Sequence, residues 1–513
     1  MGVETEGIRH NCGIAGIYVT NGEESVLNLP GLMASVLYTL QPRGQEGAGM
    51  YLENTTETYL RKDSGWAKTI FKETEIERMR LIYPHIAIGH DRYSTSGKMD
   101  AWQPLYDDNC AFVHNGNLTN AAKLLNELPA HIRDQALSDS WIAHQLIIRA
   151  DGNTMTEKIQ NSVVQFEGAY NIILAAKGKI FAVRDPWGFR PLIIGSLANN
   201  QGYIVASETS ALAPIGARFI REVHEGEGVV IDENGIQTFF VDPRTDPEKI
   251  AHCIFEFIYI SSPDSVIFNQ PVAKIRYELG RKLARADIAQ NFLPDVIVGV
   301  QQSGVLYAQG YSEEYVGAVI DHPESFGIPH DQISTTARSL VLKTGLVANP
   351  YAGRVFISPD RDDATYTKHR ANAQDVSGKI VVNVDDSVLR SLAGRALNKA
   401  EREHPLAINM PPPKEVHLRI ASPPIAHPCF MGVDFATKEQ LIAYQTNGDI
   451  EEIGRRIGVD SLKYLSHRDL VTSVVGEEKA AAISDEQLYE QTGHCGACFT
   501  GNYPIYINGT YGK

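Results

Sequence analysis

The chain has 513 residues, of which 43% are hydrophobic and 21% are charged, and no apolar run approaches the ~18 residues that span a bilayer, so we exclude a membrane protein. The formal net charge of −15 disfavours nucleic acids and anionic membranes as partners. This length predicts two domains of roughly 200 to 250 residues, and the lack of an apolar block near the N-terminus excludes a secretory signal and predicts a cytoplasmic protein.

Short strands separated by turn signals fill the first half of the chain. Apolar residues recur at intervals of three and four in 29–40 and 138–150, which predicts a helix in each. We therefore expect a mostly antiparallel α+β domain over 12–245, followed by a linker at 241–250 with two prolines among charges. The predicted strands lie within residues 12–19, 85–94, 110–118, 169–186, 202–208 and 226–235.

The second half changes to apolar strands that alternate with amphipathic helices. This rhythm predicts a parallel, doubly wound α/β sheet over 255–470, followed by a tail at 471–513. Strands are expected within residues 294–300, 378–387 and 415–422, and helices within 274–290 and 394–403.

Cys12 stands directly before the first predicted strand. A small apolar residue at the start of a core strand is one interpretation. The other is an N-terminal nucleophile, exposed when the Asn11–Cys12 bond is cleaved and residues 1–11 leave as a propeptide. The freed α-amino group has a pKa near ~8, so it can take the thiol proton without a histidine partner.

Three further motifs favour the nucleophile. In GHDRYSTSG, Arg92 can grip a carboxylate through two hydrogen bonds, with Thr95 holding it in register. In HNGNLTN, the Asn115 side chain and the Gly116 N–H can stabilise an oxyanion. In SDS, Asp139 can pair with an ammonium group. A carboxylate clamp, an ammonium acceptor, a thiol and an oxyanion hole together describe a free amino acid attacked at its side chain, and glutamine fits.

The stretches CGIAGIY, QPRGQEGAG, GHDRYST, HNGNLTN and RDPWGFRPL resemble the glutamine-hydrolysing domain of class II amidotransferases, an N-terminal-nucleophile (Ntn) hydrolase fold. Within that class the chain most resembles the amidophosphoribosyltransferase family, from residue 12 onward. The resemblance implies that Cys12 is the nucleophile, that Arg43 and Arg92 are glutamine-site arginines, and that the protein is a homotetramer or homodimer. It implies that Asn115 and Gly116 form the oxyanion hole and that Asp139 binds the α-amino group.

Six cysteines are too few and too scattered for a disulfide framework. CGAC supplies Cys495 and Cys498, and Cys253 and Cys429 come from two other segments, so four thiolates could hold zinc or an iron–sulfur cluster. The same four positions resemble the ligands of the [4Fe-4S] branch of the amidophosphoribosyltransferases, which also carries a propeptide, and we expect a structural cluster. Cys110 is left over and is expected in the core.

GKIVVNVDDSVLRS predicts a buried strand that ends at Asp385 and Asp386 and runs into a helix N-terminus, which suits a ribose diol and a phosphate. It resembles the phosphoribosyl-pyrophosphate (PRPP) loop of the type I phosphoribosyltransferase fold, and the resemblance implies an acceptor and Mg²⁺ site that includes Ser303.

Three loops depart from the family pattern. Arg-Gly-Thr-Thr is replaced by Arg390, Ser391, Leu392 and Ala393. Pro-Asp-Ser-Gly is replaced by Gln301, Gln302, Ser303 and Gly304. Lys-Asn-Arg before Tyr is replaced by Ala348, Asn349 and Pro350.

We therefore expect a glutamine amidotransferase that passes ammonia to C1 of PRPP and forms 5-phosphoribosylamine, a step of purine biosynthesis. Two alternatives stay open at this point. One is a paralogue of a specialised pathway with an intact glutaminase and a different activated acceptor, which the altered loops favour. The other is an inactive or partner-dependent protein that supplies ammonia or a docking surface.

Overall fold

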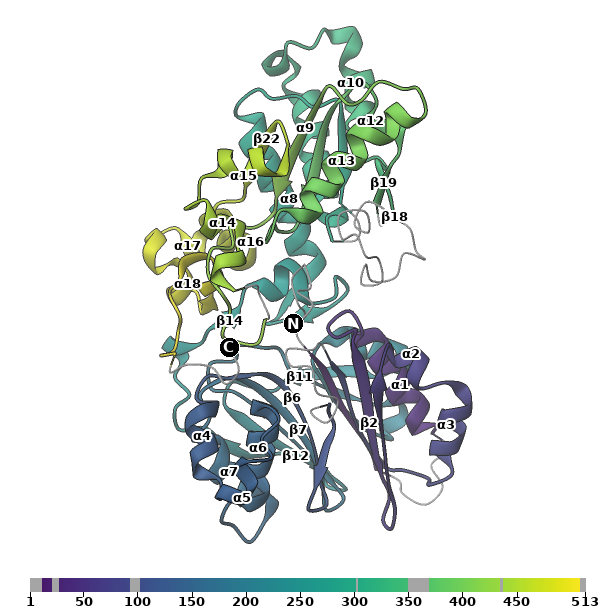
Figure 1. Cartoon of the computed structure of the whole chain (residues 1–513), viewed down its shortest axis with the longest axis vertical. Coiled ribbons are helices and arrows are strands. Elements are labelled where there is room, and N and C mark those ends of the chain that lie inside the picture. Colours follow the sequence, from purple (N-terminus) through teal and green to yellow (C-terminus); the bar gives the residue numbers. More distant parts are fainter. Residues whose placement is uncertain are drawn as a thin grey trace.

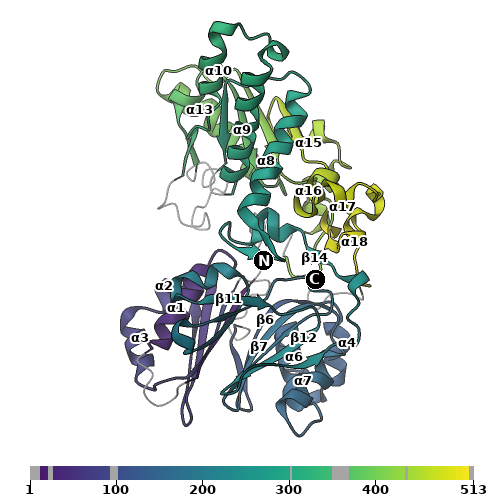
Figure 2. The ribbon, with the colours of Figure 1, turned by 180° about the vertical axis from the view of Figure 1, so that it is seen from behind.

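The structure is a computed structural model, shown in Figures 1 and 2. The predicted propeptide and Thr95 lie outside the residues that it describes. Its elements form two regions, one built on two antiparallel sheets and one on a parallel sheet (Figure 1). The described residues are 12–20, 27–92, 102–300, 303–348, 369–433 and 437–507.

The N-terminal region is a sandwich of two antiparallel sheets, which pack face to face through buried residues such as Ile14, Val113 and Ile173. Alternating residues of each strand therefore face either this inner layer or the helices outside. One sheet has the order β11-β9-β10-β1-β4-β2-β3 and the other β13-β12-β8-β7-β6-β5. The strands are β1 (Gly13–Val19), β2 (Gly47–Glu53), β3 (Thr58–Ser64), β4 (Ile86–Arg92), β5 (Leu105–Asp107), β6 (Cys110–Leu118), β7 (Gly168–Ala176), β8 (Lys179–Arg184), β9 (Ile193–Ser196), β10 (Gly202–Ala206), β11 (Arg218–Glu222), β12 (Glu227–Asp232) and β13 (Gly235–Val241).

Helices cover both outer faces of the sandwich (Figure 1). In α1 (Leu29–Leu40), Met33, Val36, Leu37 and Leu40 are buried against the seven-stranded sheet, which follows their spacing of three and four. The Ser138 side chain caps α6 by accepting a hydrogen bond from the Trp141 N–H at 3.1 Å. The other helices of this region are α2 (Ala67–Ile70), α3 (Glu73–Arg80), α4 (Ala121–Glu127), α5 (Ala130–Arg133), α6 (Asp139–Arg149) and α7 (Met155–Val163).

The C-terminal region is built on a parallel sheet of order β17-β20-β21-β22, with helices on both faces. Leu279, Leu283 and Tyr307 of α8 and α9 pack on one face, while Val376 and Leu397 of α12 and α13 pack on the other. The strands are β17 (Val296–Gly299), β20 (Ile380–Asp385), β21 (Glu415–Ile420) and β22 (Ser461–Tyr464), with a hairpin of β18 (Leu346–Ala348) and β19 (His369–Ala371). The main helices are α8 (Val272–Ile288), α9 (Val305–Asp321), α10 (Ile333–Ser339), α12 (Ala373–Val376), α13 (Leu392–Ala407), α15 (Ile450–Ile457) and α16 (His467–Val475).

The end of the chain returns to the junction between the two regions. β14 (His252–Cys253) pairs in parallel with β23 (His494–Cys495), and α19 (Ala497–Thr500) follows directly. η6, a π-helix at Glu256–Ile260, continues from β14 toward α8. Figure 2 shows β14 between the antiparallel sheets and the helices of the C-terminal region.

The predicted fold class is confirmed, since both the antiparallel sandwich and the parallel sheet are present. Cys110 is fully buried, as expected. The sequence patterns missed β2, whose seven residues are all buried and include two glycines, and α9, which is 17 residues long. Within the described residues, no helix has the length and apolar character needed to cross a membrane.

Candidate active site

Cys12 lies directly before β1, and the neighbouring strand β4 brings Arg92 beside it. β1 pairs with β4 so that Gly13 faces Asp91. Cys12, which precedes Gly13, and Arg92, which follows Asp91, therefore lie at the same end of this strand pair. Burial lowers the pKa of Arg92, and the negative charges of Cys12, Glu46 and Asp139 oppose that effect. The structure therefore brings Cys12, Arg92 and Asp139 into one electrostatic environment.

Asn115 and Gly116 lie on β6, in the other sheet of the sandwich. Asn115 is 1% exposed, and neither polar atom of its side chain has a hydrogen-bond partner among the described residues. A buried amide without partners is costly unless a ligand or water completes it. Gly116 has φ of 149°, and a Cβ there would collide with the Ala169 carbonyl. Both positions are thus suited to binding a ligand oxygen.

Asp139 is held at the first turn of α6 by contacts that the sequence motifs did not reveal. Its Oδ2 accepts a hydrogen bond from the Leu118 N–H at 3.1 Å. Ser140 Oγ lies 2.9 Å from His114 Nδ1 and accepts a hydrogen bond from Gln103 Nε2 at 3.2 Å. His114 and Ser140 stand next to the predicted residues in HNG and SDS, and that adjacency was the only signal of their role.

Arg43 contacts two buried carboxylates and the main chain of Cys12. Its side chain is fully buried, and its Nη2 lies 2.9 Å from Glu256 Oε1. Its Nη1 lies 3.5 Å from Glu208 Oε2, and its Nε donates a hydrogen bond to the Cys12 carbonyl at 3.5 Å. The contacts of Arg43 therefore connect it to the nucleophile's main chain, and its predicted role toward glutamine stays a prediction.

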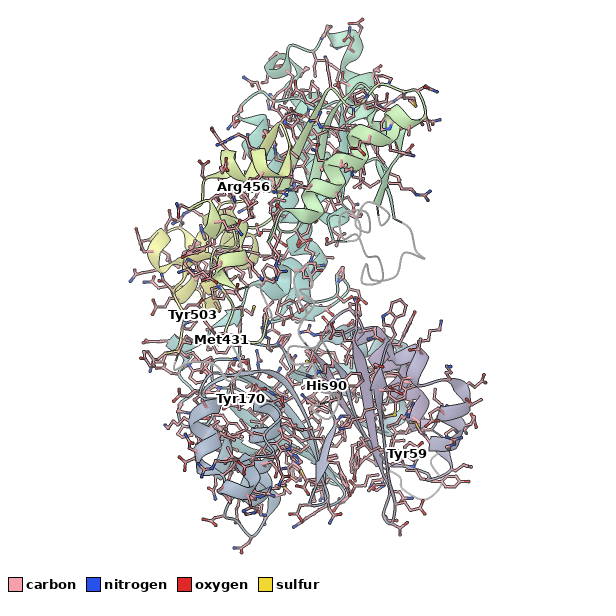
Figure 3. The ribbon with its side chains drawn as sticks, viewed as in Figure 1. Tyr59, His90, Tyr170, Met431, Arg456 and Tyr503 are labelled. Carbon is pink, nitrogen blue, oxygen red and sulfur yellow. The ribbon has the colours of Figure 1, made fainter. Side chains whose placement is uncertain are left out.

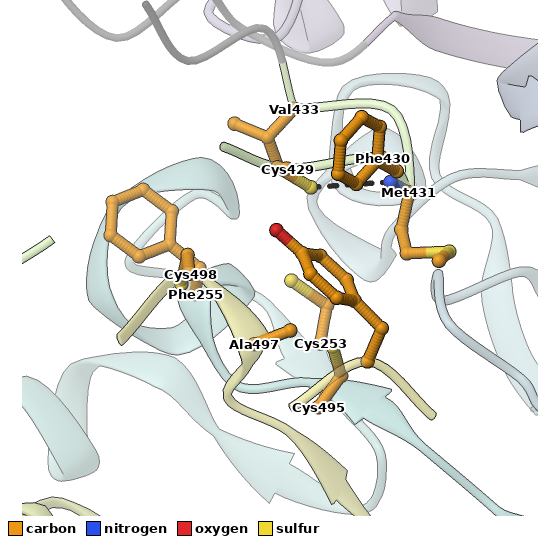
Figure 4. Close-up of a pocket in the computed structure, with 10 residues that line it drawn as sticks. Cys253, Phe255, Cys429, Phe430, Met431, Val433, Cys495, Ala497 and Cys498 are labelled. Atoms are coloured by element: carbon orange, nitrogen blue, oxygen red, sulfur yellow. Dashed lines mark hydrogen bonds between the residues drawn. The ribbon is translucent and has the colours of Figure 1, made fainter. Parts of the chain in front are cut away.

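The four cysteines predicted as metal ligands line one apolar cavity at the junction between the N-terminal and C-terminal regions (Figure 4). Cys253 and Cys495 are partners in the β14–β23 register, and Cys498 follows on α19. Cys429 Sγ accepts a hydrogen bond from the Met431 N–H at 3.3 Å. Burial raises the pKa of Cys253 to about 11. Phe255, Phe430, Met431, Val433, Ala497 and Tyr503 complete the lining.

Four thiols on one cavity raise the question of which metal group they could hold. A single tetrahedral zinc ion, with Zn–S distances of about 2.3 Å, would draw all four sulfurs close together. Among the described residues, no group of three or more His, Cys, Asp and Glu side chains is arranged to hold one metal ion. The donor set of four cysteines is one that both structural zinc sites and iron–sulfur clusters use.

Asp385 and Asp386 stand at the carboxyl end of β20, beside the end of β17, where parallel sheets bind ligands. Ser303 Oγ donates a hydrogen bond to Asp385 Oδ1 at 3.4 Å, and the Asp386 N–H donates to the same oxygen at 2.9 Å. Burial and the neighbouring Asp386 raise the pKa of Asp385 well above its ordinary value. Burial also raises the pKa of Asp386.

Comparisons with known proteins identify the family. A family model for a glutamine amidotransferase domain matches residues 90–214. The amidophosphoribosyltransferase of Bacillus subtilis (strain 168) is 34% identical over 99% of this chain and 97% of its own length. That of Rattus norvegicus is 32% identical over 98% and 99%. The chain belongs to the amidophosphoribosyltransferase family.

A solved member of this family has the same overall structure. The glutamine PRPP amidotransferase from B. subtilis, complexed with ADP and GMP, matches with a TM-score of 0.78 and 33% identity. The match covers 98% of this chain and 99% of that one. The amidophosphoribosyltransferase fold, an Ntn glutaminase domain followed by a phosphoribosyltransferase domain, is thereby confirmed.

The loop after Asp386 has an unusual backbone conformation at Ser391. Ser391 has φ of 69°, in the left-handed region that favours glycine, which is the residue that the resemblance described above implies at this position. Arg390 Nη2 donates a hydrogen bond to Gln440 Oε1 at 2.7 Å. Gln301, Gln302, Asn349 and Pro350, from the other two altered loops, lie outside the described residues.

Proposed function

We propose that this chain hydrolyses glutamine at Cys12 and transfers the ammonia to C1 of PRPP, giving 5-phosphoribosylamine in purine biosynthesis. Family membership over the full length supports this reaction. The observation that carries the assignment of the nucleophile is the β1–β4 register, which sets Cys12 beside Arg92, with Asp139 close enough to act on the charge of that arginine. These groups would hold the thiol, the substrate carboxylate and the substrate ammonium.

The glutaminase step begins after removal of the proposed propeptide. The α-amine of Cys12 takes the thiol proton, and Sγ attacks the carboxamide carbon of glutamine. Asn115 Nδ2 and the Gly116 N–H stabilise the oxyanion, and the C–N bond then breaks. The ammonium of Cys12 returns its proton to the leaving nitrogen, so ammonia departs and a γ-glutamyl thioester remains. Water hydrolyses this thioester to glutamate and restores the thiol.

At the acceptor site, Asp385 and Asp386 accept hydrogen bonds from the ribose diol, and Ser303 stands beside them. Bound Mg²⁺ would neutralise charge on the pyrophosphate, and these carboxylates are oxygen ligands of the kind it prefers. Nitrogen forms a bond to C1 as the C1–O bond breaks and pyrophosphate leaves.

We further propose that Cys253, Cys429, Cys495 and Cys498 hold a [4Fe-4S] cluster with a structural role. Four thiols on one cavity and a backbone N–H directed at Cys429 Sγ support this assignment. Iron and sulfide analysis of anaerobically purified protein should find a cluster, and substitution of Cys498 should remove it. Protein that contains zinc and no iron would contradict the proposal.

A homotetramer or homodimer in the cytoplasm completes the proposal on the strength of family membership. The direct test of function measures glutamate release with and without PRPP and Mg²⁺, together with pyrophosphate. We expect PRPP to stimulate glutamate release and pyrophosphate to appear in equal amount. Glutamate release that is indifferent to PRPP would favour a different acceptor.

A further inference from the structure

Glu256 occupies a buried junction between the nucleophile and the four-cysteine cavity. It begins the π-helix η6 and has no exposed surface. Its Oε1 accepts hydrogen bonds from Arg43 Nη2 at 2.9 Å and from Arg190 Nη1 at 3.2 Å. Its Oε2 accepts from Ser261 Oγ at 2.6 Å. One carboxylate oxygen is thus shared by two buried guanidinium groups that arrive from different elements.

The Arg43 side of this junction leads to the nucleophile. Arg43 grips both oxygens of Glu256, because its Nη1 also donates to Oε2 at 3.2 Å. The remaining donor, Nε, reaches the carbonyl of Cys12 at 3.5 Å. The position of the guanidinium, and with it the main chain of the nucleophile, therefore depends on Glu256.

The Arg190 side leads to the cysteine cavity. Arg190 Nη2 donates a hydrogen bond to the Met431 carbonyl at 2.7 Å, and the Met431 N–H donates to Cys429 Sγ. Figure 3 places Met431 at the boundary between the N-terminal sandwich and the C-terminal region. Gly432, the next residue, packs directly on the backbone of Gly116. The segment that carries Cys429 thus touches the predicted oxyanion strand as well.

Charge balance makes Glu256 the centre of this arrangement. Burial opposes its ionisation, yet Arg43 and Arg190 outweigh burial and hold the pKa of Glu256 below its ordinary value. A carboxylate that bridges two buried cations is hard to replace, since both guanidinium groups would lose their shared, fully buried partner.

We propose that Glu256 is a positioning residue that couples the four-cysteine cavity to the nucleophile, through Arg190 on one side and Arg43 on the other. This inference rests on the proposed glutaminase role of Cys12. It does not depend on which metal group the cysteines hold or on the identity of the ammonia acceptor.

The first test compares Glu256→Gln with Glu208→Gln in the full-length protein. Glu208 is matched to Glu256 in burial and also lies near Arg43, but its substitution leaves the Arg43–Glu256–Arg190 bridge intact. For glutamine hydrolysis, E256Q should lower kcat about tenfold with little change in KM, since a misplaced nucleophile slows the reaction without removing substrate contacts. E208Q leaves that bridge in place and should lower kcat by a clearly smaller factor. Equal effects of the two substitutions would overturn the proposal.

The second test measures coupling in the full-length protein as purified under reducing conditions, through the rate at which iodoacetamide alkylates Cys12, followed by peptide mass spectrometry. Cys429→Ser should change this rate when Glu256 is present and should have no further effect in the E256Q background. Effects that simply add would show that the two sites are independent. Because this readout needs neither turnover nor PRPP, it separates failure of the coupling from failure of the proposed function.

Arg190→Lys provides a variant for the case in which E256Q does not fold. Lysine keeps the positive charge but lacks the fork that reaches Glu256 and the Met431 carbonyl together. The alkylation rate of R190K should lose its dependence on Cys429→Ser, whereas retention of the full dependence would overturn the proposal.

Discussion

The glutaminase site and the acceptor site support their reactive residues in different ways. On the glutaminase side, Asp139 is held by the Leu118 N–H, and its neighbour Ser140 is bonded to His114 and Gln103, all from other segments. On the acceptor side, Asp385 is held by its own neighbour Asp386 and by Ser303. The first site is thus fixed by the sandwich, whereas the second depends on a few loop residues.

This difference indicates where the chain can vary without losing its fold. A site fixed by many buried partners tolerates little change, because each substitution leaves another buried polar group unsatisfied. A site on loops that follow strand ends can change its ligand contacts while the sheet below stays intact. We therefore expect substitutions to be tolerated more readily around Asp385 than around Asp139.

Substitution of the nucleophile should have the largest effect. Cys12→Ala should lower glutamate release by at least about 10³-fold, since no other group can form the thioester. Cys110→Ala is the matched control, because burial raises the pKa of Cys110 to about 12 and that thiol is fully buried. Near-normal glutamate release by Cys12→Ala, measured in an enzyme-coupled glutamate assay, would remove the basis of the proposed function.

The oxyanion residue should give the next largest effect. Asn115→Ala should lower kcat for glutamine hydrolysis about 10²- to 10³-fold, with a small change in KM, because Nδ2 acts on the charge that develops in the transition state. Asn171→Ala tests whether this loss is specific. Asn171 faces Asn115 in the β6–β7 register, but its Nδ2 is already bonded to the Pro191 carbonyl. A rise in KM alone for Asn115→Ala would instead indicate a ground-state contact.

These predictions also show what the sequence could and could not reveal. A strand within 110–118 and a helix at about 29–40 were predicted from turn signals and from helical spacing, and β6 and α1 lie there. The role of Arg43 was not predictable, because its partner Glu256 lies 213 positions away and no local pattern connects them. The left-handed backbone of Ser391 could not be predicted from the residue itself, because serine gives no signal of positive φ.

Proton linkage should distinguish the acceptor site from the glutaminase site. Because the pKa of Asp385 is raised, Asp385 carries a proton below that raised value, and a bound cation must displace it. The affinity for Mg²⁺ with PRPP should therefore rise about tenfold per pH unit below that pKa and level off above it. Isothermal titration calorimetry at several pH values measures both the affinity and the released proton.

Two variants sharpen the assignment of that proton. Asp386→Asn removes the like charge beside Asp385, so the pKa of Asp385 should fall and the plateau should begin at lower pH. Glu401→Gln is the matched control, since burial raises the pKa of Glu401 to about 7 but this carboxylate contacts Asn383 rather than the acceptor pair. Loss of the pH dependence in Glu401→Gln would instead assign the displaced proton to Glu401 and contradict its assignment to Asp385.

The smallest expected effect concerns Ser391, whose backbone has a left-handed φ of 69°. A non-glycine residue with left-handed φ costs about 1 kcal/mol or more, while glycine gains freedom in the unfolded chain that offsets part of this cost. Ser391→Gly should therefore stabilise the C-terminal region by a few tenths to about 1 kcal/mol, as measured by urea unfolding. Ser391→Ala keeps the strained φ and should not stabilise. If Ser391→Gly destabilises the protein, then contacts of the Ser391 side chain outweigh its backbone strain, and the serine is an adaptation of the loop rather than a tolerated change.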